Sequence, residues 1–227
     1  MNYMLILIYV VIFVCDRYKG VNSFVPEGRA EHNAILVEKR LYFHGGWLVN
    51  PPDSRYPNNV LFFLDVSIPF TISNKSLMPW TDLSSITGAI NRTGASACVD
   101  MLKASIFFIG GDYSVNAITV FNTTLQQWSI PSISGQIPLP GNLKYVPCIS
   151  LENKIYIYGG NTSLSAMNQL DTLNLSWSIL SYSISSSKTQ GYSATLLNDS
   201  ILYIGGTNKL QSQGWDCPSK TSNLMKE

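Results

Sequence analysis

Four pairs of glycines recur along this chain, and each pair closes a short run of alternating or wholly apolar residues. The pairs fall at residues 45–46, 110–111, 159–160 and 205–206, directly after the runs LYFH, IFFI, IYIY and ILYI. Such runs predict β-strands, and a single glycine pair after a strand would indicate only a bulge or a turn. Four pairs, spaced 65, 49 and 46 residues apart, instead indicate an internal repeat.

The residues before each glycine pair predict two strands joined by a tight turn. A small residue lies twelve positions before the second glycine in three repeats, as Ala34, Cys148 and Ala194. Cys98 takes this position in the second repeat if that repeat has one additional turn residue. Short polar segments (VEKR, DMLKA, ENK and NDS) follow and predict the hairpins.

A tryptophan indicates a fourth strand in each of the first three repeats. Trp128 and Trp177 both lie seventeen residues after the second glycine of their repeat, and each follows a predicted third strand. The first repeat keeps this order with longer loops, so Trp80 opens its fourth strand. Each repeat is therefore predicted to be a four-stranded antiparallel meander, with the tryptophans packed between neighbouring units.

This arrangement resembles the kelch repeat, whose period is about 50 residues and whose product is a β-propeller blade. The resemblance rests on eight glycines and three tryptophans: Gly45, Gly46, Gly110, Gly111, Gly159, Gly160, Gly205, Gly206, Trp80, Trp128 and Trp177. The chain is similar to secreted kelch proteins of fungal type and to the central domain of galactose oxidase. The resemblance implies an all-β fold, with residues 24–227 forming a kelch-repeat β-propeller region.

The repeats supply about three complete blades and part of a fourth, so the expected ring is incomplete. Three explanations are compatible with this count: a truncated gene product, a propeller that another chain completes, or an open arc. Truncation is favoured, because an open arc would expose unpaired edges and risk aggregation.

Residues 1–23 are predicted to be a secretory signal peptide. Met4 to Cys15 form an uninterrupted apolar run of twelve residues, which suits a signal peptide and is short for a membrane span. Val21 and Ser23 give an acceptable cleavage pattern, so the mature chain is expected to begin near Phe24. An uncleaved membrane anchor is the alternative. We therefore expect a secreted or extracellular protein, or one held at the membrane by this segment.

Six Asn-x-Ser/Thr sequons favour a glycoprotein, at Asn74, Asn91, Asn122, Asn161, Asn174 and Asn198. Three cysteines would follow the cleavage site, namely Cys98, Cys148 and Cys217, and an odd number cannot all pair within one chain. Cys98 and Cys148 are expected to be compact buried residues of the first strands.

Composition and motifs exclude several classes of function. The formal net charge is +1 without a basic cluster, so we expect no nucleic-acid partner. The sequence contains neither a phosphate-binding glycine loop with lysine nor a Cys-x-x-Cys pair. We therefore expect no cofactor and no metal.

The resemblance to galactose oxidase would imply a copper site for catalysis. Such a site needs two histidines and two tyrosines, and one of the tyrosines is cross-linked to a cysteine. The chain has only His32 and His44, and neither belongs to a set of ligands with suitable spacing. Asp65 and Asp171 are expected to be turn residues and not a glycosidase pair. A non-catalytic module is predicted, with a degenerate carbohydrate oxidase or a fragment without independent function as alternatives.

The surface loops are the predicted binding sites, because a rigid scaffold with variable loops suits recognition. The longest insertion covers residues 47–59 and contains Trp47, Arg55 and Tyr56, residue types that are enriched in binding hot spots. These three residues are the predicted contacts for a protein or glycan ligand. The loop SISGQIPLPGNLK, at residues 132–144, is a second candidate.

Overall fold

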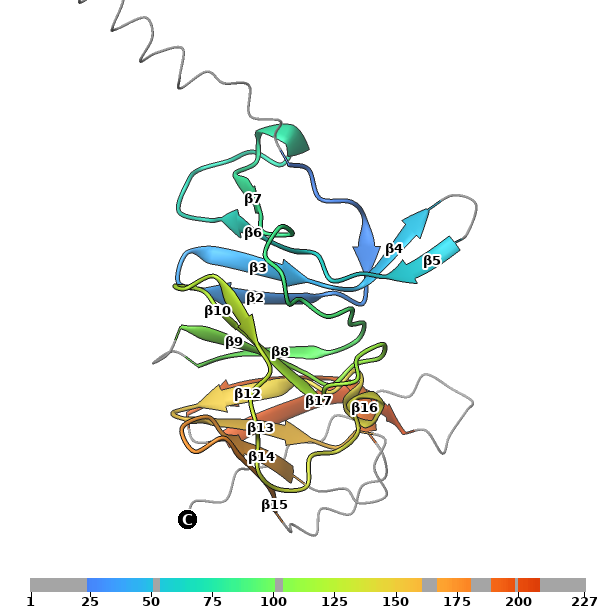
Figure 1. Ribbon diagram of the computed structural model, residues 1–227, viewed down its shortest axis with the longest axis vertical. Helices are drawn as coiled ribbons and strands as arrows, with labels where there is room; N and C mark the ends of the chain where they lie inside the picture. Colours follow the sequence, from blue (N-terminus) through green and yellow to red (C-terminus); the bar gives the residue numbers. More distant parts are fainter. Residues whose placement is uncertain are drawn as a thin grey trace, which may run out of the picture.

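The computed structural model in Figure 1 describes residues 24–50, 54–100, 104–160, 167–180, 189–198 and 200–208. Apart from two short 3₁₀ helices, η1 (Lys75–Leu77) and η2 (Pro140–Leu143), the regular structure in these ranges is β. None of the helices in the described ranges has the length and apolar character needed to cross a membrane. The predicted signal peptide lies outside the described residues.

Three four-stranded antiparallel sheets follow one another along the chain, each in the predicted order. Blade 1 contains β2 (Asn33–Val37), β3 (Arg40–His44), β6 (Leu61–Asp65) and β7 (Trp80–Asp82). Blade 2 contains β8 (Ser96–Asp100), β9 (Ser105–Ile109), β10 (Ile118–Asn122) and β11 (Gln127–Ser129). Blade 3 contains β12 (Cys148–Leu151), β13 (Lys154–Tyr158), β14 (Met167–Asp171) and β15 (Ser176–Leu180). Blade 4 is represented by β16 (Thr189–Leu197) and β17 (Ser200–Asn208). Three four-stranded antiparallel blades and part of a fourth, without a closed ring, are thus confirmed for the described residues.

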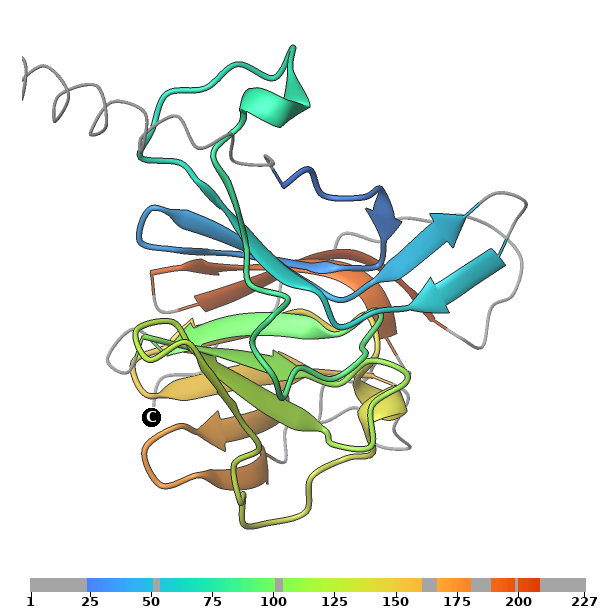
Figure 2. The same ribbon diagram turned by 45° about the horizontal axis from the view of Figure 1, so that its top comes forward.

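The insertion in blade 1 folds into a hairpin, which the sequence analysis did not predict. β4 (Trp47–Asn50) pairs with β5 (Ser54–Pro57) and with the short strand β1 (Arg29–Ala30). Leu48 is buried, which fixes the base of the hairpin, and Pro57 ends an edge strand, where proline is tolerated in a sheet. The hairpin projects from the side of blade 1 in Figures 1 and 2.

Each blade has two distinct ends. At one end, called the Gly-Gly end, the second strand reaches its glycine pair and the first strand begins. The opposite end has the turns between the first and second strands and between the third and fourth. There Asp65 accepts a hydrogen bond from the backbone N–H of Ser67 at 2.9 Å. Asp171 accepts bonds from Leu173 and Asn174, both at 2.9 Å, so both aspartates are turn residues, as predicted.

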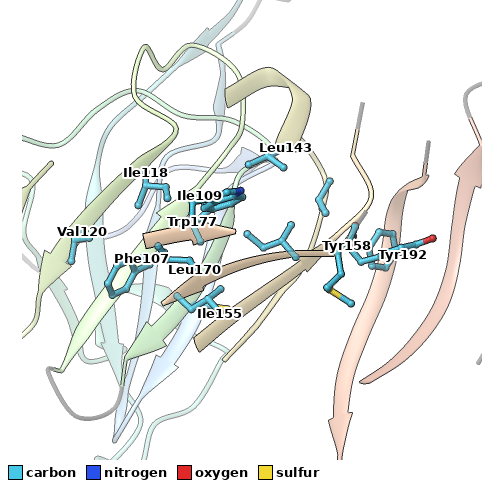
Figure 3. Close-up of a cluster of buried hydrophobic side chains, with 14 residues drawn as sticks. Phe107, Ile109, Ile118, Val120, Leu143, Ile155, Tyr158, Leu170, Trp177 and Tyr192 are labelled. Atoms are coloured by element: carbon cyan, nitrogen blue, oxygen red, sulfur yellow. Dashed lines mark hydrogen bonds between the residues drawn. The ribbon is translucent and has the colours of Figure 1, made fainter. Parts of the chain in front are cut away.

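The second strand of a blade buries side chains on both of its faces. In β9, Ile106 and Phe108 pack toward blade 1, whereas Phe107 and Ile109 pack toward blade 3. Figure 3 shows Phe107 and Ile109 in one cluster with Trp177 of blade 3. Burial on both faces explains why the runs before the glycine pairs are so apolar.

The three repeat tryptophans are packing residues in the fourth strands. Trp128 lies between blades 1 and 2, with its ring centroid 4.9 Å from that of His44 and 5.1 Å from that of Phe121. Trp177 is buried in the cluster between blades 2 and 3. Trp80 packs edge-on against Phe62 on the outer face of blade 1.

Two cysteines meet in the interface between blades 2 and 3. The register pairs Ala97 with Phe108, so Ala97 is the small residue of the second repeat, and the expectation that Cys98 takes this position is wrong because the turn is longer than expected. Cys98 is buried, and Cys148 packs against the same cluster from blade 3. Both are free thiols, and burial together with a hydrogen bond to Cys98 raises the pKa of Cys148. Cys217 lies outside the described residues.

The glycine pairs lie where one blade touches the link to the next. Gly110 has φ +72°, and a Cβ atom on it would collide with the backbone oxygen of Leu143 in the link to blade 3. A Cβ atom on Gly45 would collide with the backbone oxygen of Arg92 in the link to blade 2. The Gly46 N–H also donates to that oxygen at 2.8 Å. Glycine is therefore required by left-handed backbone and by close approach together.

A buried arginine, which the sequence analysis missed, ties the link to its own blade. Arg92 is fully buried, and its guanidinium donates to the Gly110 carbonyl. It also donates to the carbonyls of Asn116 at 2.8 Å and Ala117 at 3.3 Å. Arg29, at the equivalent position of the first repeat, donates to the Gly45 carbonyl at 3.3 Å. Both arginines precede the small residue of their repeat by five positions, so a repeat alignment could have found them.

His44 is expected to make the fold sensitive to acid. It is fully buried against Phe108 and Trp128, and neither ring nitrogen has a hydrogen-bond partner among the described residues. Burial, with a smaller contribution from the charge of Arg92, lowers the pKa of His44 to about 3. The unfolded chain, with a histidine pKa of about 6.5, therefore binds more protons below that pH. The contribution of His44 to the free energy of unfolding is therefore fully present above pH 6.5 and is lost as the pH is lowered toward 3.

The expected loss from this histidine is about 2–3 kcal/mol between pH 7.5 and pH 4.5. Urea unfolding at a series of pH values measures it, and the His44→Ile variant should remove most of this dependence. Isoleucine occupies the equivalent position in the second and fourth repeats, as Ile109 and Ile204. His32→Asn, which changes an exposed histidine, is the control. Equal pH dependence in His44→Ile and the unmodified chain would contradict the prediction.

Candidate functional site

Side chains from three successive units meet at the Gly-Gly end. We call them the Lys144 cluster: Glu31, Trp47, Asp112, Tyr113, Lys144 and Tyr145. Glu31 precedes β2 and Trp47 begins β4, whereas Asp112 and Tyr113 directly follow the second glycine pair. Lys144 and Tyr145 follow helix η2 in the link to blade 3. The cluster is thus built from links and turns that the blades hold in place.

Lys144 is the charged centre of the cluster. Its Nζ lies 2.5 Å from Oδ2 of Asp112 and 3.7 Å from Oε2 of Glu31. Burial by itself would lower the pKa of Lys144, but hydrogen bonds to Asp112 and Tyr145 outweigh burial, so the pKa is raised. The ammonium therefore stays charged at neutral pH and joins the carboxylates of blades 1 and 2.

Three aromatic rings surround this centre. The indole Nε1 of Trp47 donates to Oε2 of Glu31 at 3.0 Å, and the Trp47 ring packs edge-on against Tyr113 at 4.9 Å between centroids. The Lys144 ammonium lies 4.5 Å from the centroid of the Tyr145 ring. Burial and a hydrogen bond to Glu31 raise the pKa of Tyr145. Tyr113 and Tyr145 are both exposed, so the cluster presents aromatic surface to solvent.

Backbone hydrogen bonds between successive links support the cluster. The Gly94 N–H donates to the Glu31 carbonyl at 2.9 Å, and the Tyr145 N–H donates to the Gly94 carbonyl at 2.7 Å. The Gly191 N–H then donates to the Tyr145 carbonyl at 2.8 Å. These four residues have φ between +56° and +69°, and each precedes the small residue of its repeat by three positions. A repeating hydrogen-bond series thus connects all four units.

The chemistry of the cluster suits binding. One ammonium and two carboxylates leave a net charge of −1, beside exposed rings and polar atoms that can contact a polypeptide. The described residues contain no group of three His, Cys, Asp or Glu side chains that could hold a metal ion. His32 packs on Phe43 and His44 is buried on Phe108, so the two histidines lie on opposite faces of blade 1.

The predicted binding residues differ in their relation to the Lys144 cluster. Trp47 is a member of it. Tyr56 is exposed on β5, opposite Leu48, while the side chain of Arg55 lies outside the described residues. The second candidate loop, residues 132–144, ends in Lys144, but its Leu143 is buried in the core, so much of this loop has a packing role.

Four members of the cluster, Glu31, Asp112, Tyr113 and Tyr145, lie outside the predicted binding loops. Glu31 and Tyr145 could have been found by aligning the repeats, since both lie three residues before the small residue. Asp112 and Tyr113 follow a glycine pair directly and could have been found as turn residues at the Gly-Gly end. Their approach to Lys144 depends on the packing of three blades, which sequence spacing does not give.

Comparison with known proteins gives consistent results. The sequence matches the KLHDC2/KLHL20/DRC7 Kelch-repeats domain over residues 17–206. Kelch domain-containing protein 3 of Rattus norvegicus is 25% identical over 197 residues, covering 78% of this chain and 48% of that protein. Kelch domain-containing protein 1 of Mus musculus is 33% identical over 121 residues, covering 49% of this chain and 29% of that protein.

A solved structure, that of YjhT, has a similar fold. Its TM-score is 0.60 at 17% sequence identity, and the match covers 78% of this chain and 59% of that one. The chain spans about half the length of the Kelch domain-containing protein 3 sequences that it matches.

Proposed function

The chain belongs to the kelch-repeat family, and from this premise we propose that it is a non-catalytic binding module which recognises an extracellular protein or glycan through its Gly-Gly end. Kelch repeats are generally protein-interaction modules, and the kelch-repeat relatives are typically binding or scaffold domains. The ligand contacts proposed here are Trp47, Arg55 and Tyr56 of the hairpin, together with the Lys144 cluster.

The single observation that supports this surface is the meeting of charges and exposed aromatic rings from three units. Tyr113 and Tyr145 are exposed beside Lys144, Asp112 and Glu31. Tyrosine and tryptophan in such a setting supply contact area at low entropic cost, and charges at the rim steer and orient a partner. The blades hold these groups rigidly, which lowers the cost of ordering on binding.

Binding of the full chain to extracellular proteins and to a glycan array tests the proposal. We expect Trp47→Ala, Arg55→Ala and Tyr56→Ala together to weaken capture of the ligand by at least about 30-fold, the effect of losing one hot-spot residue. Tyr113→Ala, which changes an exposed ring, should also weaken it. The matched control is Glu38→Ala with Lys39→Ala in the turn at the opposite end of blade 1. Undiminished binding by the hairpin and Tyr113 variants, or an equal loss in the control, would contradict the proposal.

We also propose that residues 1–23 direct secretion and that the sequons are modified. Asn74, Asn91, Asn174 and Asn198 are exposed, which supports access of the modifying enzyme, while Asn122 is half-buried and Asn161 lies outside the described residues. Sequencing of the N-terminus of the chain from culture medium tests cleavage before Phe24. A shift in electrophoretic mobility after deglycosylation tests the sugars, and an intracellular, unshifted protein would contradict both.

A further inference from the structure

Cys98 and Cys148 face each other across the junction between blades 2 and 3. Directly paired residues of antiparallel strands lie on the same face of a sheet. Cys98 pairs with Phe107, which packs toward blade 3. Cys148 pairs with Ile157, which lies in the same buried cluster, whereas the next residue, Tyr158, packs toward blade 4. The two thiols therefore point into one interface from opposite sides.

The first strands of blades 2 and 3 approach each other closely at this point. Cα atoms of β8 lie within 8 Å of Cα atoms of β12. The Ser96 hydroxyl donates to the Val146 carbonyl, and each of these residues precedes its cysteine by two positions. Two residues farther along, the thiols of Cys98 and Cys148 are hydrogen-bonded to each other. A disulfide needs side chains that point together from Cα atoms about 4.4–6.8 Å apart, and this arrangement is compatible with both conditions.

The other two junctions have isoleucine and alanine where this one has two cysteines. The equivalent positions between blades 1 and 2 are Ile35 and Ala97. Those between blades 3 and 4 are Ile149 and Ala194. A large and a small apolar side chain fill the space between first strands by packing alone. The junction of blades 2 and 3 thus differs from its counterparts in having a reactive group on each side.

We propose that Cys98 and Cys148 form a disulfide bond, which joins blade 2 to blade 3 when the chain folds in the presence of a low-molecular-weight disulfide. The first cysteine thiolate attacks one sulfur of this oxidant and releases one small thiol, which leaves a mixed disulfide. The second thiolate attacks the protein sulfur of the mixed disulfide and releases the other small thiol. Two cysteine thiols are thus oxidised, one external disulfide is reduced, and the two protons end on the released thiols.

The exchange takes place before the two blades are fully packed. Cys98 is buried, and burial together with the hydrogen bond raises the pKa of Cys148, so the packed junction contains little thiolate. The neighbouring blades also keep an external disulfide away from both sulfurs. We therefore expect the bond to form while blade 3 can still move away from blade 2, and we expect packing to protect it from reduction afterwards.

The bond also fixes the support of the Lys144 cluster. Lys144 and Tyr145 lie in the link that leads into β12, whereas Asp112 follows β9 of blade 2. A bridge between β8 and β12 therefore holds both sides of this ion pair together. It closes a loop of about 50 residues, so it removes conformational freedom from the unfolded chain and stabilises the packed blades.

Refolding of the full chain from urea in a glutathione redox buffer, followed by tryptic mapping without reductant, tests the proposal. Trypsin releases Cys98 in residues 93–103 and Cys148 in residues 145–154. We expect these two peptides to be joined in the refolded chain and to separate after reduction. Cys15 and Cys217 lie in other tryptic peptides, so the same map shows any competing pair. The experiment supplies the oxidant, so its result does not depend on where the protein is located.

Urea unfolding with and without a reductant measures the effect of the bond on stability. We expect reduction to lower the midpoint of the refolded chain by about 1 M urea. The matched variant is Cys98→Ile with Cys148→Ala, which reproduces the residue pairs of the two other junctions. It should fold and have one midpoint under both conditions. Cys217→Ser should keep the link and the difference between the two midpoints.

Three results would overturn the proposal. The first is that both thiols stay free after refolding in the oxidising buffer, as alkylation in urea would show. The second is a main product in which Cys98 or Cys148 is linked to Cys15, to Cys217 or to another chain. The third is a midpoint shift on reduction that persists when Cys98→Ile is combined with Cys148→Ala, because a different bond would then cause the shift.

Discussion

Replacing Arg92 by alanine is expected to lower the free energy of unfolding by about 3–5 kcal/mol, from orphaned buried carbonyls and a cavity together. The guanidinium is fully buried, and burial lowers its pKa only to about 10, so it stays charged at neutral pH. It is the donor that satisfies the Gly110 carbonyl, and it also bonds to Asn116. Alanine leaves buried carbonyl oxygen without a partner and a cavity where the side chain was.

Two further variants separate the causes of this loss. Arg92→Met keeps most of the side-chain volume and removes the donors, so it should lose about 1–3 kcal/mol, the cost of an orphaned buried group. Arg40→Ala removes an exposed arginine that lies 4.9 Å from the Phe63 ring centroid, and should lose about 1 kcal/mol or less. Urea unfolding of each variant gives the comparison. An Arg92→Ala variant as stable as Arg40→Ala would refute the role of this buried cation.

The repeat could be predicted from the sequence because its signals are local and recur. Gly159 and Gly160 after a strand, and Trp177 seventeen residues on, match their counterparts in the second repeat, so spacing alone indicates a four-stranded unit. The hairpin at Trp47 was missed because an insertion has no counterpart to compare. Cys98 was placed one residue from the correct register because the length of a turn does not affect the strand pattern on either side.

The candidate site was predictable only in part, for a different physical reason. Trp47 was identified by residue type and by its place in a long loop. Lys144 reaches Asp112 and Glu31 only after three units have packed, and ion pairs between distant segments leave no spacing signal. An arginine normally predicts an exposed side chain, because arginine is seldom fully buried, so Arg92 was not expected in the core. In each case the missing information is the packing of one blade on the next.

Gly110→Ala is expected to lower the free energy of unfolding by about 2–5 kcal/mol. Left-handed backbone costs alanine about 1–2 kcal/mol, and φ at Gly110 is +72°. The new methyl group would also collide with the backbone of Leu143 in the link to blade 3, and overpacking of this kind costs about 1–3 kcal/mol more. Urea unfolding followed by tryptophan fluorescence measures the sum.

Gly191→Ala is the matched control, because it separates backbone strain from contact between blades. Its φ of +69° is nearly the same as that of Gly110, but no atom of the described residues lies within 4 Å of the added methyl group. With respect to the described residues, Gly191→Ala should therefore lose only the cost of left-handed backbone, about 1–2 kcal/mol. The difference between the two losses of unfolding free energy measures the cost of placing a methyl group against the backbone of Leu143. Equal losses would mean that the glycine pairs serve the turn alone, and that the junction between blades tolerates a side chain at this position.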